Sequence, residues 1–128
     1  MSDDPGSILR LLDAELGRVP DPERRTSLAA LLVSPARINL GWDYGAEGEL
    51  LDCWLVGQSP DHDVLLLYCE QGFGPSFPWG FVFPLEDSMG MDSQWHSSLE
   101  DAAVNAGLLQ APPGYSVPGP RGVWSPFD

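Results

Sequence analysis

The sequence predicts an α+β domain: an N-terminal helical hairpin packed on an antiparallel sheet of about four strands, then a short helix and a Pro-rich arm. Two helix-start signals come first, and four apolar or aromatic runs of strand length follow. A chain of 128 residues fits a single core. We therefore expect one domain, with the helical hairpin in residues 1–36, the sheet in 37–84, a loop and short helix in 85–111, and a packed arm in 112–128.

Both predicted helices begin at an Asp-Pro pair, at residues 4–5 and again at 21–22. The aspartate supplies an N-cap oxygen, and proline fits the first helical position. Leucines at helical spacing carry the first helix to Gly17 and the second for about three turns, until Ser34 and Pro35 end the pattern. Two short helices so close together form a hairpin whose leucine faces need a larger surface, which we expect the sheet to provide.

Four segments predict the strands, and they are residues 37–44, 49–57, 64–70 and 78–83. The middle two flank a strong turn signal, so they form a hairpin that we expect to be symmetric about Asp61. The pairs in that register are Cys53 with Cys69, Trp54 with Tyr68, Leu55 with Leu67, and Val56 with Leu66. Both faces of the hairpin are then apolar. We expect the helices to cover one face, and other parts of the chain or a partner to cover the other.

Three segments follow the sheet. Residues 71–78 hold two Gly, two Pro and two Phe, which predicts a structured loop. A longer loop over residues 84–96 leads to a capping box at Ser97 and Glu100, which predicts a short helix. The tail from residue 112 combines proline with aromatic anchors, which is typical of an extended arm packed over the domain.

Charge and composition exclude several classes of protein. The 6 basic residues are all Arg and stand against 19 acidic ones, so the net charge is -13. Nucleic acids and anionic membranes need a cationic surface, so neither is an expected partner. The chain has no apolar run of membrane-spanning length, and its N-terminus lacks the positive charge of a signal peptide. We expect a cytoplasmic monomer or weak dimer with a cationic partner.

The sequence offers little catalytic chemistry. Cys53 and Cys69 could form a cross-strand disulfide in the predicted register, but a cytosolic context and the strain of that geometry favour buried thiols. No base or cation in the sequence pattern would activate either of them for catalysis. His62 and His96 lack the spacing of a metal site, so we expect surface or capping roles for both. We predict no catalytic residue, no metal and no cofactor.

Aromatic and acidic residues are instead combined in the predicted loops, as is typical of protein–protein hot spots. Each aromatic side chain taken alone also suits a small core, so both interpretations stay open. Acidic residues around such anchors would oppose a cationic groove and speed association. A surface of this kind suits an inhibitor of a nuclease.

Between about residues 41 and 103 the chain reads WDYG, CW, YCEQGFGP, PWG and GMDSQW before an SLEDA helix. This order of motifs resembles the immunity proteins of bacterial polymorphic and contact-dependent toxin systems. The resemblance implies a toxin inhibitor that binds the C-terminal domain of one cognate toxin, blocks its active site and has no catalysis of its own. The contact residues that it implies are Trp42, Asp43, Glu70, Phe73, Asp92, Trp95, Glu100 and Asp101.

Two alternatives stay open. An adaptor or interaction module would bury its aromatic side chains in the core, and its acidity would only keep it in solution. A small hydrolase would use a carboxylate pair, with Asp52 and Glu70 lining a concave pocket.

Overall fold

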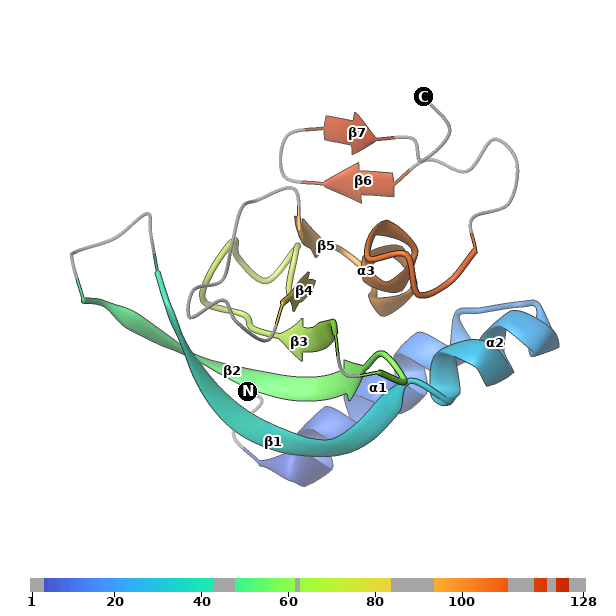
Figure 1. The fold of residues 1–128 in the computed structure, drawn as a ribbon, viewed down its shortest axis with the longest axis horizontal. Helices are drawn as coiled ribbons and strands as arrows, with labels where there is room; N and C mark the ends of the chain where they lie inside the picture. The colour runs from blue at the N-terminus through green and yellow to red at the C-terminus, as the bar shows by residue number, and fades with distance from the viewer. Residues whose placement is uncertain are drawn as a thin grey trace.

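The computed structural model describes residues 4–42, 48–61, 63–83 and 94–110, together with the backbone of 117–119 and 122–124. Within these ranges the chain is α+β, as predicted, with one strand more than expected in its main antiparallel sheet (Figure 1). The helices are α1 (Pro5–Gly17), α2 (Pro22–Ala29) and α3 (Leu99–Asn105). The sheet has the order β1-β2-β3-β4-β5, and its strands are β1 (Leu32–Gly41), β2 (Leu50–Gln58), β3 (Leu65–Tyr68), β4 (Trp79–Val82) and β5 (Trp95–His96).

The two N-terminal helices start at the predicted Asp-Pro pairs. Oδ1 of Asp4 accepts a hydrogen bond from the Ser7 N–H at 2.8 Å, and Oδ1 of Asp21 accepts one from the Glu23 N–H at 3.0 Å. Each cap satisfies one of the N–H groups that a helix start leaves without an intrahelical acceptor. The local sequence signal therefore determines both starting points.

The predicted end of the second helix is wrong. Strand β1 already begins at Leu32, inside the segment that leucine spacing assigns to the helix. The Leu31 carbonyl accepts a hydrogen bond from the Gln58 N–H at 2.9 Å, which joins this segment to the end of β2. Pro35 lies inside β1, at a shift in its register with β2, rather than after a helix. An edge strand tolerates proline at such an irregularity, because no ladder N–H is lost there.

The central hairpin follows the predicted register at its open end, where Trp54 lies opposite Tyr68 and Leu55 opposite Leu67. Beyond Leu55 the register shifts by one residue, so Gly57 rather than Val56 lies opposite Leu66, and the last predicted pair is wrong. A Cβ on Gly57 would lie 2.8 Å from the Leu31 carbonyl oxygen. Glycine at this position therefore leaves room for the segment that leads into β1.

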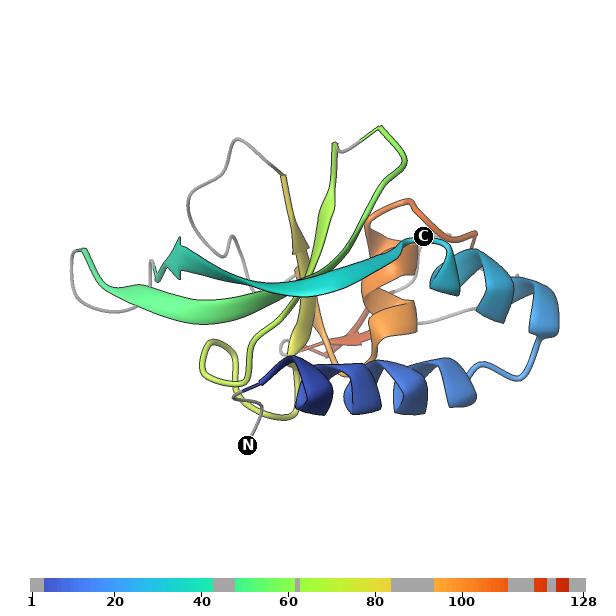
Figure 2. The same cartoon turned by 90° about the horizontal axis from the view of Figure 1, so that it is seen from below.

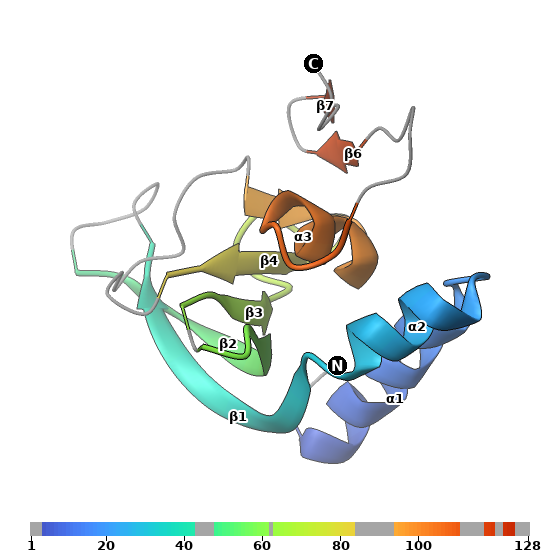
Figure 3. The ribbon, with the colours of Figure 1, turned by 45° about the vertical axis from the view of Figure 1, so that its right-hand side comes forward.

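Both faces of the sheet are apolar, as the hairpin pattern predicts, because successive side chains of a strand point to opposite faces. One face packs against all three helices, which lie on the same side of the sheet (Figure 3). We call the opposite one the second face. Its buried members are Leu40, Cys53, Leu67, Cys69, Val82 and Trp95. The partly buried residues around them are Ile38, Trp42, Leu51, Leu55, Leu65 and Phe73, and we call these six the apolar rim.

Helix α3 starts one residue later than predicted. Its N-cap is Ser98 rather than Ser97, and Ser98 Oγ accepts a hydrogen bond from the Asp101 N–H at 3.1 Å. His96 is not a surface or capping residue: it belongs to β5, is 3% exposed, and its Nε2 lies 2.8 Å from Asn105 Nδ2. Strand β5 was not predicted, because two residues are too few to show a periodic pattern.

The predicted arm contains a second, two-stranded antiparallel sheet, with β6 (Val117–Gly119) paired to β7 (Gly122–Trp124). The backbone of β6 lies close to β5 and α3. The arm is therefore a small hairpin in its described part rather than a single extended segment. Among the helices of the described ranges, none has the length and apolarity that crossing a membrane requires.

Candidate binding surface

Three predicted contact residues lie together on the second face. Trp42 directly follows β1, Phe73 belongs to the loop after β3, and Trp95 begins β5. The ring centroids of Trp42 and Phe73 are 5.1 Å apart in an edge-to-face arrangement, and those of Phe73 and Trp95 are 6.2 Å apart. Aromatic pairs of this kind are worth about 0.5–1.5 kcal/mol beyond their buried area. We call these three residues the aromatic row.

Trp95 is the buried end of the aromatic row, and a glycine in the neighbouring strand makes room for its ring. Trp95 is 0% exposed and lies over Gly80, its partner in the register of β4 and β5. A Cβ on Gly80 would lie 2.4 Å from Cδ2 of Trp95, so only glycine leaves room for the indole. Trp95 has no surface to offer to a partner, and the structure removes it from the predicted contact residues. Its role is to support Phe73, which in turn contacts Trp42.

The outer end of the row has acidic and apolar neighbours. The Trp42 N–H donates a hydrogen bond to the Glu49 carbonyl at 2.9 Å, which continues the ladder between β1 and β2. Leu50, the first residue of β2, is 60% exposed. Glu70 is half-buried and lies at the end of β3, which in this antiparallel sheet is the end where β1 finishes and β2 begins. Half-exposed rings and carboxylates therefore share one end of the sheet.

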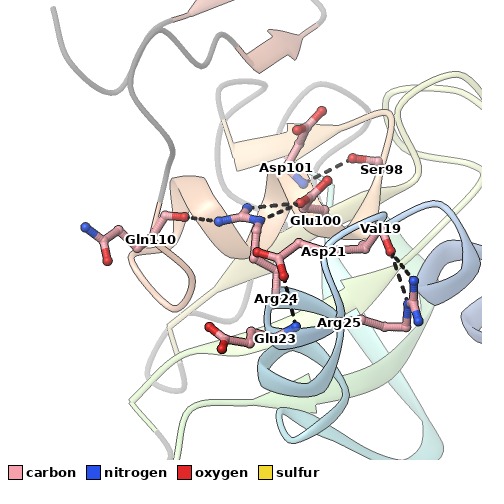
Figure 4. A network of polar contacts seen from close by, with 9 residues as sticks. All are labelled: Val19, Asp21, Glu23, Arg24, Arg25, Ser98, Glu100, Asp101 and Gln110. Carbon is pink, nitrogen blue, oxygen red and sulfur yellow. Dashed lines mark hydrogen bonds and ion pairs between the residues drawn. The ribbon is translucent and has the colours of Figure 1, made fainter.

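Glu100, another predicted contact residue, lies elsewhere. It belongs to α3, where its Oε2 accepts hydrogen bonds from Nε and Nη2 of Arg24 at 3.1 and 2.9 Å (Figure 4). Nη1 of the same guanidinium donates to the Gln110 carbonyl. The Glu100 charge is thus used to join α2 to α3, and it is not part of the aromatic row. A charge reversal at Glu100 would place two guanidinium groups together and would test folding rather than binding.

Asp101, the next residue, is 7% exposed. Burial raises its pKa to about 6, and the nearby Glu100 and Glu15 carboxylates act in the same direction, while a hydrogen bond from Ser98 opposes the shift. A carboxyl group in this position is part of the packing around the start of α3. It offers little surface to a partner.

Glu15 is a structurally important residue that the sequence analysis missed. It lies on the buried side of α1 with Ile8 and Leu12, and it is 7% exposed. Its Oε1 accepts a hydrogen bond from the Leu99 N–H at 2.8 Å, and its Oε2 lies 3.0 Å from Nη1 of Arg18. Glu15 therefore caps a helix from another helix. An acidic residue at helical spacing among buried leucines was the signal that could have found it.

The two cysteines are free, buried thiols, as predicted. They lie next to the Trp54–Tyr68 pair, toward the open end of the hairpin. Their thiols are hydrogen-bonded to each other on the second face. The contact raises the pKa of Cys53, to which burial adds, and lowers the pKa of Cys69 to about 7. Sγ of Cys69 also donates to the Asp52 carbonyl at 3.4 Å. Both thiols lie beneath the surface that the apolar rim surrounds.

The other residues singled out in the sequence contribute little to the candidate surface. Asp43, Asp92 and His62 lie outside the described residues. Oδ2 of Asp52 lies 3.9 Å from Nη1 of Arg37, so the carboxylate of the predicted hydrolase pair has a cation beside it. Over the ranges that the structure describes, no three His, Cys, Asp or Glu side chains are grouped as metal ligands would be.

No protein-family model matches the chain, and neither a curated protein nor a solved structure matches it. A fold alone does not determine function. The function has to follow from the protein's own surface, and three of the predicted contact residues lie together on the second face.

Proposed function

We propose that this protein is an immunity protein, which binds one cognate, cationic toxin domain and neutralises it without catalysis. The contact surface in this proposal is the apolar rim together with the exposed part of the aromatic row, Trp42 and Phe73. The observation that carries the proposal is that the second face is apolar to its border while its border residues stay partly exposed. What sets this border apart from that of the helix-covered face is its pair of aromatic residues, Trp42 and Phe73, whose rings pack edge to face and stay partly exposed.

The residue types on this surface suit protein recognition. Aromatic anchors that are partly exposed, packed on a fixed core and flanked by polar groups are typical of interface hot spots. Trp42 and Phe73 meet each of these conditions, because Trp95 fixes Phe73 from below and Glu70 lies at the same end of the sheet.

The charge of the molecule supports a cationic partner. Every arginine of the described ranges already contacts an acceptor within the molecule: Arg10 the Ser7 Oγ, Arg18 Glu15, Arg24 Glu100, Arg25 the Val19 carbonyl, and Arg37 Asp52. These five arginines are held by neighbours within the molecule, which as a whole carries a net charge of -13. The field of such a charge attracts a basic protein and raises its association rate, most strongly at low salt.

This combination suggests how inhibition would occur. A toxin that acts on nucleic acid needs a cationic groove for the phosphates of its substrate. An acidic protein with apolar anchors can occupy or cover that groove, with charge accelerating the encounter and the anchors slowing dissociation. Stoichiometric binding is sufficient, so no catalytic group is required.

One observation favours a second candidate, the adaptor or interaction module. Trp54, Trp79 and Trp95 are all buried in the core, as that interpretation predicts for aromatic residues. The two candidates differ in the partner, because only an inhibitor abolishes a toxic activity. The hydrolase alternative gains no comparable support from the residues that the structure describes.

The test is co-expression with the protein encoded immediately beside the gene of this protein, which the proposal takes to be the toxin, followed by titration calorimetry with its C-terminal domain. We expect protection of the cells, and a complex whose affinity falls steeply with salt. Trp42→Ala should weaken binding at least about tenfold, because it removes an anchor. Its control is Leu9→Ala, a change of a 50% exposed side chain on α1.

Two charge-reversal variants test the electrostatic contribution to binding in the same way. Glu70→Arg should lower the association rate and flatten its dependence on salt, whereas Asp13→Arg makes the same charge change on the exposed side of α1 and should have a smaller effect. If the two reversals change the association rate equally, the attraction comes from the net charge of the molecule and not from Glu70 in particular. No binding and no protection by the wild-type protein would refute the proposed function.

A further inference from the structure

The sheet has a long strand at one edge. Strand β1 has ten residues and pairs with β2 alone in the five-stranded sheet. Its C-terminal half runs out beyond the three helices in two perpendicular views (Figures 1 and 2). Its N-terminal half carries Pro35 and the register shift, which are features that discourage a further strand from pairing there. The regular part, from Ala36 to Gly41, lacks them.

The hydrogen-bond pattern shows which backbone groups face outward. In an antiparallel pair, alternate residues direct both N–H and C=O at the partner strand. The Trp42 N–H donates to Glu49, and the register is regular from Ala36 to Gly41, so residues 36, 38 and 40 also face β2. The N–H and C=O of Asn39 and Gly41 therefore point to the outer edge. These are the groups with which a further strand would pair.

The two sides of this edge differ in chemistry. Ile38 and Leu40 belong to the second face, where Ile38 is part of the apolar rim. Asn39 is exposed on the other side, and its neighbour in the register is Asp52, whose side chain is 64% exposed. A strand added here would place alternate side chains against an apolar row and beside a carboxylate. Arg37 on the same side lies 3.9 Å from that carboxylate, so a segment that alternates apolar and polar residues fits both sides, and the net charge of -13 favours basic residues among the polar ones.

We propose that an extended segment of the cationic partner adds to the sheet as a sixth strand, paired with β1 at Asn39 and Gly41. The inference rests on the proposed function and names the geometry by which that partner binds. Two copies of this chain each carry a net charge of -13, so mutual repulsion disfavours a second copy as the occupant. A basic strand has the complementary charge, and backbone pairing would continue the contact made by the apolar rim.

The experiment changes one backbone group. Asn39→Pro removes the outward N–H, while the ladder to β2 keeps all its hydrogen bonds because this N–H does not belong to it. Asn39→Thr is the matched control, since it keeps the N–H and suits a strand. Circular dichroism and melting temperature check that both variants fold. The probe is the toxin domain encoded beside the gene, and the readouts are its Kd and the hydrogen exchange of the amides in the complex.

We expect Asn39→Pro to weaken toxin binding at least about tenfold and Asn39→Thr to leave it within about threefold, since a lost backbone hydrogen bond and a steric clash add. In the complex, the amides of Asn39 and Gly41 should exchange at least about tenfold more slowly than in the free protein. Equal affinities of the two variants, with wild-type binding intact, overturn the strand geometry and leave the proposed function standing. A dimer that Asn39→Pro dissociates also overturns it, because the occupant is then a second copy. If the wild-type protein does not bind the toxin, the proposed function fails and this inference fails with it.

Discussion

Gly80 is the residue at which the second face can be tested most sharply. Replacing it with alanine adds a single methyl group between β4 and the indole of Trp95. The added Cβ would lie 2.4 Å from Cδ2 and 2.7 Å from Cε2 and Cε3 of that ring. Carbon atoms normally approach to about 3.5–4.0 Å, so the ring has to move by about 1 Å. Trp95 is 0% exposed and contacts Phe73, so it cannot turn into solvent without disturbing the aromatic row.

Overpacking of this kind usually costs about 1–3 kcal/mol, and a buried ring with little space around it places the change near the upper limit. We therefore expect Gly80→Ala to lower the free energy of unfolding by about 3 kcal/mol, and the melting temperature by about 10 °C for a domain of this size. Urea unfolding followed by far-ultraviolet circular dichroism measures this without relying on the fluorescence of the displaced tryptophan.

The matched control is Gly17→Ala. Gly17 is the last residue of α1, it is exposed, and a Cβ there would have no heavy atom within 4 Å. Alanine should be neutral or stabilising by up to about 1 kcal/mol at this position. A loss of less than about 1 kcal/mol for Gly80→Ala would refute the packing described for Trp95. So would strict additivity of Gly80→Ala with Trp95→Leu, because the smaller side chain should relieve the clash.

Three further predictions concern groups inside the fold. Arg24→Ala should lower the free energy of unfolding by about 1–2 kcal/mol, since it removes the cation from Glu100 between α2 and α3; an unchanged urea midpoint would contradict this. The pKa of Asp101 lies at about 6, above its ordinary 3.8, so its contribution to stability is complete below pH 3.8 and is lost as the pH rises through 6. Asp101→Asn should therefore gain stability relative to the wild type between pH 4 and 7, by at most about 3 kcal/mol before solvent screening; parallel pH curves would contradict the assignment. Cys53 and Cys69 should resist an aromatic disulfide reagent in the native protein and both react in denaturant, whereas a rapidly labelled native thiol would contradict their burial.

Local signals predicted the parts of the fold that local interactions determine. The Asp-Pro caps at Asp4 and Asp21 are contacts within three residues, and both helices start there. The end of α2 depends instead on Gln58, which is distant in the sequence and draws Leu31 into the sheet. The register shift between Leu55 and Gly57 also lies at a contact between distant parts of the chain, since the Leu31 carbonyl oxygen approaches Gly57 closely. Neither contact leaves a periodic pattern in the sequence.

For the candidate surface, the sequence indicated residue types but not which side chains are buried. Aromatic composition singled out Trp42, Phe73 and Trp95 alike, and it could not show that Trp95 is buried against the glycine of the neighbouring strand while Trp42 and Phe73 stay partly exposed. The acidic residues Glu100 and Asp101 look like surface residues in the sequence, since each is hydrophilic and near a helix start. In the fold, however, Glu100 forms an ion pair with Arg24, and Asp101 is buried with a raised pKa.

We propose that this protein neutralises a cationic toxin through the second face of its sheet. The most direct measurement is the survival of cells that express the toxin domain encoded beside the gene, together with either the wild-type protein, Trp42→Ala or Leu9→Ala. We predict survival with the wild-type protein and with Leu9→Ala, and loss of protection with Trp42→Ala at equal protein levels. Death in all cultures would contradict the inhibitory function, and equal survival in all of them would contradict the surface assigned to it.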